Sequence, residues 1–198
     1  MNYLAHAYLS FNVQPILLGN MISDFVKGKK QFDYSPAIQK GIRLHRAIDD
    51  FTDTHEATRE AKQVFKPVIG LYAGAYTDIV YDYFLGNDKN EFSDERALET
   101  FTTDVYKQVS LNINELPERF QMMFPYMQRD NWLYNYHYEF GIERSFRGVA
   151  HRAKFPIAYE AAYAAFIENQ NLLYNCYLAF FPSLKKKAEV FLQQLNDN

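Results

Sequence analysis

The chain has 198 residues, of which 48% are hydrophobic and 17% aromatic, and its formal net charge at pH 7 is −3. This composition is typical of one folded domain; it excludes a disordered chain and does not favour a general nucleic-acid binder. Cys176 is the only cysteine, so neither an intramolecular disulfide nor a cysteine-based zinc site can form. The first residues lack a basic leader and apolar run, so we expect no signal peptide and a soluble cytoplasmic protein.

Two short helices are expected at the start of the chain, and each carries a polar residue of interest. Residues 1–10 predict a helix or turn that contains His6. A second helix, from residue 14 or 15 to Val26, has a proline near its start, which suits a first turn. Because the sequence around Asp24 is strongly apolar, we expect this carboxylate in a position that would otherwise be core.

The next helix is expected to open at Ser35 and Pro36, which are suited to a cap and a first turn. His45 and Asp49 lie four residues apart on it, among apolar positions that recur at helical spacing. An acid one turn from an inward-facing histidine, in a chain with other inward-facing acids, favours metal ligation over a lone structural histidine. The lysine-rich loop before this helix suits the end of the second helix, where cations offset the helix dipole.

The run from Pro67 to Asn87 is apolar on nearly every face, and we expect a central buried helix within it, from about Leu71 to Leu85. Its only charged side chains, Asp78 and Asp82, share one stripe with Leu71, Ala75 and Leu85. Burying two unpaired carboxylates would be costly, so something cationic must meet them. A salt bridge and a metal ion are both open at this point.

The second half of the chain is expected to be helical, and no segment alternates as a strand would. The predicted fold class is therefore all-α, a single domain over residues 1–198 built around the central helix. Its histidines, His137 and His151, have no acid at i+4 among apolar neighbours and are assigned to scaffold and partner surface. The helices expected here span residues 93–111, 115–127, 131–138, 141–150 and 156–180, and a last one opens at Pro182.

The inward-facing polar residues suggest a metal centre, with Asn20 and Ser23 nearby. Mixed imidazole and carboxylate ligands without thiolates favour Mn²⁺ or Mg²⁺ over a structural zinc, and Fe²⁺ is also compatible. A metal of this kind activates water and polarises a phosphoryl oxygen, and phosphoester hydrolysis needs both. The chain has no Walker A loop, Rossmann fingerprint, H-E-x-x-H or G-x-S-x-G motif. The candidate metal ligands are His6, Asp24, His45, Asp49, Asp78 and Asp82.

Four blocks, MNYLAHAYLS, GNMISDFVKG, GIRLHRAIDDFTD and TDIVYDYFL, resemble the acyl carrier protein phosphodiesterase family, a divergent branch of the HD metal-dependent phosphohydrolase superfamily. The resemblance implies an HD-like helical bundle that hydrolyses holo acyl carrier protein to the apo protein and 4′-phosphopantetheine, with Mn²⁺ as the metal. The resemblance implies roles as ligands or water-activating groups for Asp24, His45, Asp78 and Asp82. His6 and Asp49 are further candidates for the same site.

The HD superfamily takes its name from a doublet of adjacent histidine and aspartate residues, and this chain departs from that pattern. His45 is followed by Arg46, and the nearest acid on the same helix face is Asp49. Because the implied carrier protein is acidic, its docking would need a basic surface although this chain has a net negative charge. The lysines at 185–187 are not assigned to this surface and are interpreted as a solvated helix face. The expected docking residues lie beside the metal residues in sequence: Lys27, Lys29, Lys30, Arg43 and Arg46.

Two alternatives remain open. One keeps the metal site but acts on a nucleotide or another small phosphoester. The other is a non-catalytic helical protein that binds carrier proteins or lipids, its acids neutralised by Arg43, Arg46, Arg144 or Arg147. No nucleic-acid partner is expected, because the net charge is −3. No membrane span is expected, because two aspartates interrupt the one apolar run of sufficient length. The tyrosines interpreted as ordinary core and surface aromatics, with a groove for the pantetheine arm as the alternative, are Tyr126, Tyr134, Tyr136, Tyr138, Tyr159 and Tyr163.

Overall fold

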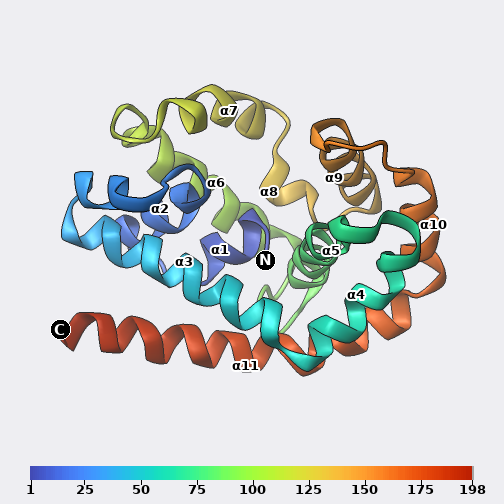
Figure 1. The fold of residues 1–198 in the computed structure, drawn as a ribbon. Helices are drawn as coiled ribbons and strands as arrows, with labels where there is room; N and C mark the ends of the chain where they lie inside the picture. Colours follow the sequence, from blue (N-terminus) through green and yellow to red (C-terminus); the bar gives the residue numbers. More distant parts are fainter. Residues whose placement is uncertain (198) are drawn as a thin grey trace.

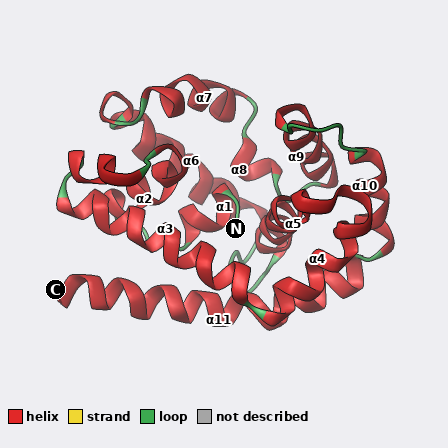
Figure 2. Cartoon of the chain, viewed as in Figure 1, coloured by secondary structure: helices red, strands yellow, loops and turns green. Residues whose placement is uncertain are grey.

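Helices form most of residues 1–197, the part of the chain that the computed structural model describes, and no strand occurs among them (Figures 1 and 2). The all-α prediction is confirmed. No helix in this part of the chain is both long enough and apolar enough to cross a bilayer. Short 3₁₀ helices connect several of the α-helices: η1 (Ser23–Phe25), η2 (Gly28–Asp33), η3 (Gly70–Tyr72) and η4 (Ile113–Glu115). The α-helices are α1 (Tyr3–Tyr8), α2 (Gln14–Ile22), α3 (Pro36–Thr54), α4 (Glu56–Ile69), α5 (Ala73–Asn87), α6 (Glu95–Leu111), α7 (Glu118–Arg129), α8 (Trp132–Asn135), α9 (Glu139–Arg152), α10 (Tyr159–Glu168) and α11 (Gln170–Asp197).

Helices α2 and α3 form the most extensive helix pair in the fold, because glycines let their backbones meet. A Cβ atom on Gly19 would lie 2.1 Å from the carbonyl oxygen of Ile38, and one on Gly41 would lie 2.3 Å from that of Ile16. No side chain fits at such distances, so only glycine permits this approach. The contact fixes the polar residues of α2 against those of α3.

Helix α5 lies between α1, α4 and α9, and most of its residues are buried (Figure 1). The central helix is thus confirmed, but it begins at Ala73, after the predicted start. The predicted start at Leu71 lies in η3, and the residues before η3 belong to α4, which contains Pro67 and ends where Gly70 adopts a positive φ of 55°. Leu71 and Ala75, which were expected on the stripe of the two aspartates, are both exposed, Leu71 by 98%.

The C-terminal helices differ from the prediction in two places. The segment expected as one helix over residues 156–180 divides at Asn169 into α10 and the start of α11. Pro182, which was expected to open the last helix, lies inside α11 instead. Phe181 and Leu184 on either side of it are buried in the core, and this burial outweighs the missing backbone N–H of the proline. The other helices of this half form where predicted, with shifted ends.

Candidate metal centre

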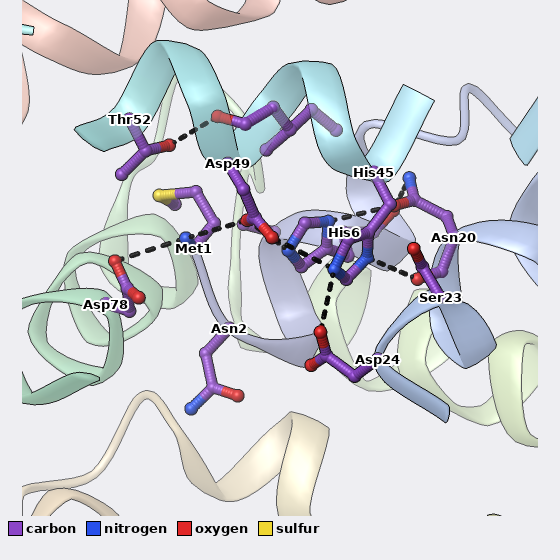
Figure 3. Close-up of polar contacts among 12 residues, drawn as sticks. Met1, Asn2, His6, Asn20, Ser23, Asp24, His45, Asp49, Thr52 and Asp78 are labelled. Atoms are coloured by element: carbon purple, nitrogen blue, oxygen red, sulfur yellow. Dashed lines mark hydrogen bonds and ion pairs between the residues drawn. The ribbon is translucent and has the colours of Figure 1, made fainter. Parts of the chain in front are cut away.

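Two histidines from different helices stack at the centre of the site (Figure 3). The rings of His6 on α1 and His45 on α3 have centroids 3.8 Å apart and an interplanar angle of 11°. Both residues are buried. Their Nε2 atoms face the two carboxylate oxygens of Asp49, which lies one turn beyond His45 on α3, at 3.2 Å from His6 and 3.1 Å from His45. Asp49 therefore bridges the two rings.

Asn20 of α2 orients both histidines from the other side. Its side-chain Oδ1 lies 2.8 Å from His6 Nδ1, and its backbone carbonyl oxygen lies 2.7 Å from His45 Nδ1. The side-chain amide is fixed in turn, because its Nδ2 donates to the carbonyl oxygen of His6 and to Ser10 Oγ. Since these carbonyl oxygens can only accept, the hydrogen is on Nδ1 in both rings. Nε2 is therefore the atom that each histidine offers to a metal.

The histidines differ in charge. Burial and the neighbouring charge of His45 lower the pKa of His6 to about 4. Burial also lowers the pKa of His45, but hydrogen bonds to Asp24 and Asp49 outweigh it and raise this pKa to about 9. Burial raises the pKa of Asp49, yet the two histidines together hold it well below its usual range. The surroundings of the ionised Asp49 carboxylate therefore favour a positive charge beside it.

Asp78 of α5 extends the acidic cluster beyond Asp49. The amino group of Met1 lies 3.1 Å from Asp78 Oδ1 and 3.6 Å from Asp49 Oδ1. A cationic group therefore sits between these two carboxylates, as the sequence predicted for Asp78; the same prediction for Asp82 was wrong, because within residues 1–197 that carboxylate meets backbone N–H groups and no cation forms an ion pair with it. The partner of Asp78 is this amine and not an arginine. Among the described residues, no arginine forms an ion pair with an acid of this cluster, which speaks against neutralisation by the four arginines considered from the sequence.

Asp24 lies on the open side of the cluster. Its Oδ1 is 3.4 Å from His45 Nε2, and its side chain is 72% exposed. The expectation of a core position was wrong, because α2 ends at Ile22 and the chain turns into η1. This turn directs Asp24 toward solvent while it stays within reach of His45. The hydrogen bond with His45 lowers the pKa of Asp24, so the carboxylate is ionised at neutral pH.

Asp82 has a different environment from Asp78, one turn away on α5. Its fully buried carboxylate accepts hydrogen bonds from the backbone N–H groups of Asn2, Leu4 and Ala5, at 3.3, 2.7 and 3.3 Å. These N–H groups belong to the first turn of α1, where a helix has no partners of its own. Burial raises the pKa of Asp82 to about 7, and the backbone donors oppose this rise. Asp82 therefore anchors α1 to α5 and does not face the histidines.

The remaining cluster fits a divalent metal. His6, His45 and Asp49 offer ligand atoms that all lie within 4.8 Å of one another, close enough to bind one ion. Both imidazoles already have the orientation and the Nδ1 partner of metal-bound histidines. Nitrogen and carboxylate oxygen donors without thiolate suit Mn²⁺ or Fe²⁺, and the carboxylates also suit Mg²⁺. The structure thus brings together five of the six predicted ligands, with Asp24 and Asp78 at the edges, and leaves Asp82 apart.

Comparison with known proteins assigns a family to this chain. Residues 1–184 match the family model described as acyl carrier protein phosphodiesterase. The chain belongs to this family. Curated relatives of the same name include one from Yersinia pestis, 29% identical over 96% of this chain and 98% of the relative, and one from Photorhabdus laumondii, 30% identical over 96% of both. Another, from Klebsiella pneumoniae, is 30% identical over 96% of this chain and 98% of the relative. No solved structure matches the chain.

In this member of the acyl carrier protein phosphodiesterase family, the expected docking residues are all exposed; the lysines follow Asp24 in the chain, and the two arginines lie on either side of His45. Lys27, Lys29 and Lys30 lie just before or within η2. Arg46 donates hydrogen bonds to the carbonyl oxygen of Val26 at 3.2 Å and to Gln31 Oε1 at 2.9 Å, so it connects this segment to α3. Arg43 is exposed on α3 as well.

Sequence reasoning missed two features of this family member. The first is the amine of Met1, whose contact with Asp78 joins positions far apart in the chain. The second is a cavity that α9 lines with Arg144, Arg147 and Arg152. The spacing of Arg144 and Arg147 on a predicted helix was a usable signal, but charged residues at such spacing are usually a solvated face, and only the packing of α9 against α5 distinguishes the two.

Proposed function

We propose that this chain is a metal-dependent phosphodiesterase that hydrolyses holo acyl carrier protein to apo acyl carrier protein and free 4′-phosphopantetheine. The observation that carries the proposal is the convergence of His6, His45 and Asp49 on one point. This convergence occurs in a chain whose relatives, matched over nearly their whole length, are named acyl carrier protein phosphodiesterases. The donor set is one that supports phosphodiester hydrolysis through a bound divalent ion.

The proposed metal is Mn²⁺, with Mg²⁺ or Fe²⁺ as alternatives. His6, His45 and Asp49 would hold it, with Asp24 and Asp78 as further ligands or water-binding groups. When bound, the metal lowers the pKa of a water molecule and polarises the phosphoryl oxygen. Asp24 is ionised and faces solvent, so it can accept a hydrogen bond from an attacking water and orient it. Asn20 keeps both imidazoles aligned toward the same point.

The proposal includes a distant relation to the HD phosphohydrolases. In this chain the doublet is replaced by His45 and Asp49, which are one helical turn apart on α3 and face the same point. An i, i+4 pair on a helix brings two ligand atoms together without adjacency in sequence. A cytoplasmic location is also part of the proposal, and the free thiol of Cys176 fits a reducing compartment.

The carrier protein would dock on the basic segment near Asp24. Lys27, Lys29 and Lys30 are exposed there, although the chain as a whole has a net charge of −3. Complementary charge of this kind steers an acidic partner and increases its association rate.

The decisive experiment is intact-mass spectrometry of holo acyl carrier protein incubated with this protein and Mn²⁺. We expect conversion to the apo mass and release of 4′-phosphopantetheine. A chelator or Asp49→Asn should abolish the conversion, whereas Asp50→Asn, at the exposed neighbouring position, should not. Conversion that persists in chelator would refute the metal-dependent reaction. Cleavage of bis(p-nitrophenyl) phosphate without cleavage of the carrier protein would replace the proposed substrate with a small phosphoester. If neither compound is cleaved, a binding role replaces the enzymatic one.

A further inference from the structure

A cavity of about 230 Å³ lies beside the metal centre, between the start of α1, α5, α8 and α9. Asn2 and Tyr3 form part of its wall, and Ile79 forms another part. Asn2 directly follows Met1 and Ile79 directly follows Asp78, and the ion pair of Met1 with Asp78 belongs to the metal centre. In Figure 3, Asn2 and Asp24 lie on the same side of the cluster, away from α3. The cavity therefore adjoins the open side of the metal centre.

The wall that α9 contributes is strongly basic. Arg144, Arg147 and Arg152 all line the cavity. Arg144 lies 3.5 Å from Asp130, whereas no ion pair within residues 1–197 involves Arg147 or Arg152. Arginines that lack an acidic partner at the wall of a cavity favour an anionic ligand, because the guanidinium group binds phosphate oxygens well.

Tyr3 connects this basic wall to the metal centre. Burial and the charge of Asp24 raise the pKa of the Tyr3 hydroxyl, and the charge of Arg152 lowers it. Tyr3 lines the cavity together with Arg152, and Asn2 next to it follows Met1, whose amine pairs with Asp49 and Asp78. The cavity wall that holds Arg152 is therefore continuous with the chain segment at the metal centre.

The other walls of the cavity suit a ligand that is neither purely apolar nor purely charged. Trp132 and the buried Tyr136 supply aromatic surface. Asn2, Asn135 and Ser145 supply groups that can donate and accept hydrogen bonds. This combination of apolar surface with a few polar groups and a cationic wall is typical of a small-molecule site.

We propose that this cavity binds the pantetheine arm of the substrate, with Arg152 at the phosphate end. The inference rests on the proposed function, since the arm of holo acyl carrier protein combines a phosphodiester with amides, a hydroxyl group and a branched aliphatic segment. The aliphatic part packs on Trp132 and the amides meet the polar walls. The folded carrier protein stays outside, on the basic segment at Lys27, Lys29 and Lys30.

Trp132 makes the proposal directly testable, because it is the only tryptophan of the chain and lines the cavity. The protein is titrated in Mg²⁺ with 4′-phosphopantetheine, with pantetheine and with an apo acyl carrier protein that lacks tryptophan. None of these ligands contains the bond that the enzyme would cleave, so no turnover interferes. We expect a saturable change in Trp132 emission with 4′-phosphopantetheine, binding about tenfold weaker for pantetheine, and no change with the apo protein.

The matched variants are Arg152→Gln and Arg59→Gln, both at exposed positions, of which Arg59 lines a different surface hollow. Arg152→Gln should weaken 4′-phosphopantetheine binding about tenfold and leave pantetheine binding nearly unchanged. Arg59→Gln should affect neither. An unchanged Trp132 signal with 4′-phosphopantetheine would overturn the proposal. An equal signal with the apo carrier protein would also overturn it and make the cavity a contact for the protein surface.

A parallel mass-spectrometric measurement on holo acyl carrier protein separates this inference from the proposed function. Hydrolysis of the holo protein without any Trp132 response to 4′-phosphopantetheine would refute the cavity as the arm site and keep the enzyme assignment. A specific Trp132 response that Arg152→Gln weakens, without hydrolysis, would support the cavity as a pantetheine site and refute the phosphodiesterase reaction.

Discussion

Replacement of Asp82 by alanine tests whether the two aspartates of α5 have different roles. The substitution leaves the backbone N–H groups of Asn2, Leu4 and Ala5 without their acceptor, and Leu4 and Ala5 are fully buried. Each buried donor without a partner costs about 1–3 kcal/mol. Two of the three bonds are long, and the buried carboxylate is itself unfavourable, so we expect a net loss of about 3 kcal/mol in the free energy of unfolding.

For a chain of this length, that loss corresponds to a decrease in Tm of about 6–12 °C. Thermal unfolding followed by circular dichroism in chelator measures it without any contribution from bound metal. Asp82→Asn keeps one acceptor oxygen and should lose less, and Asp50→Ala, at an exposed position on α3, should leave Tm unchanged.

Metal binding gives the second half of this test. Because Asp82 does not face the histidines, folded Asp82→Asn should bind Mn²⁺ with nearly unchanged affinity in isothermal titration calorimetry. The reasoning fails if Asp82→Ala unfolds at the temperature of the unmodified protein. It also fails if Asp82→Asn remains fully stable but no longer binds metal, because Asp82 would then be a ligand.

Three further predictions concern the metal centre and the docking segment. Asn20→Ala removes the side-chain acceptor of one histidine and should lower Mn²⁺ affinity about 10- to 100-fold in calorimetry; unchanged affinity would show that Asn20 does not support the site. The Mn²⁺ affinity should rise between about pH 6 and pH 9, because the raised pKa of His45 means that a proton competes with the metal until about pH 9; a flat profile would contradict this competition. Reversal of Lys29 and Lys30 to glutamate should raise KM for holo acyl carrier protein at low salt with little change in kcat, whereas Lys186→Glu should not; an unchanged KM in the double variant would exclude this docking segment.

The parts of the site that depend on local sequence were predictable. His45 and Asp49 lie on one face of α3 because an i, i+4 pair does so on any helix, and Ser35 caps that helix as expected. The central position of α5 followed from its apolar character on all sides. These properties depend on residues within a few turns of one another, so one sequence contains enough information to derive them.

The parts that depend on contacts distant in sequence were not predictable. Asp78 and Asp82 lie one turn apart on α5 and have similar sequence neighbours. Yet Asp78 meets the amine of Met1, and Asp82 meets backbone N–H groups of α1. Which acid meets which group depends on how α1 docks on α5. The exposure of Asp24 depends on the end of α2, which no proline or glycine marks in the sequence. Pro182 lies within a helix because packing outweighs the tendency of proline to begin or break one. Tertiary packing decides each of these cases.

The glycine contact between α2 and α3 has a consequence for ion selectivity. Asn20, the neighbour of Gly19, positions one imidazole with its side chain and the other with its backbone, so the distance between the two helix axes also sets the space between the metal-binding nitrogens. One added methyl group at Gly19 would change that space without touching any ligand. For the proposed divalent ion, the preference among ions of different radius would therefore depend in part on a helix–helix contact that includes none of the candidate ligands.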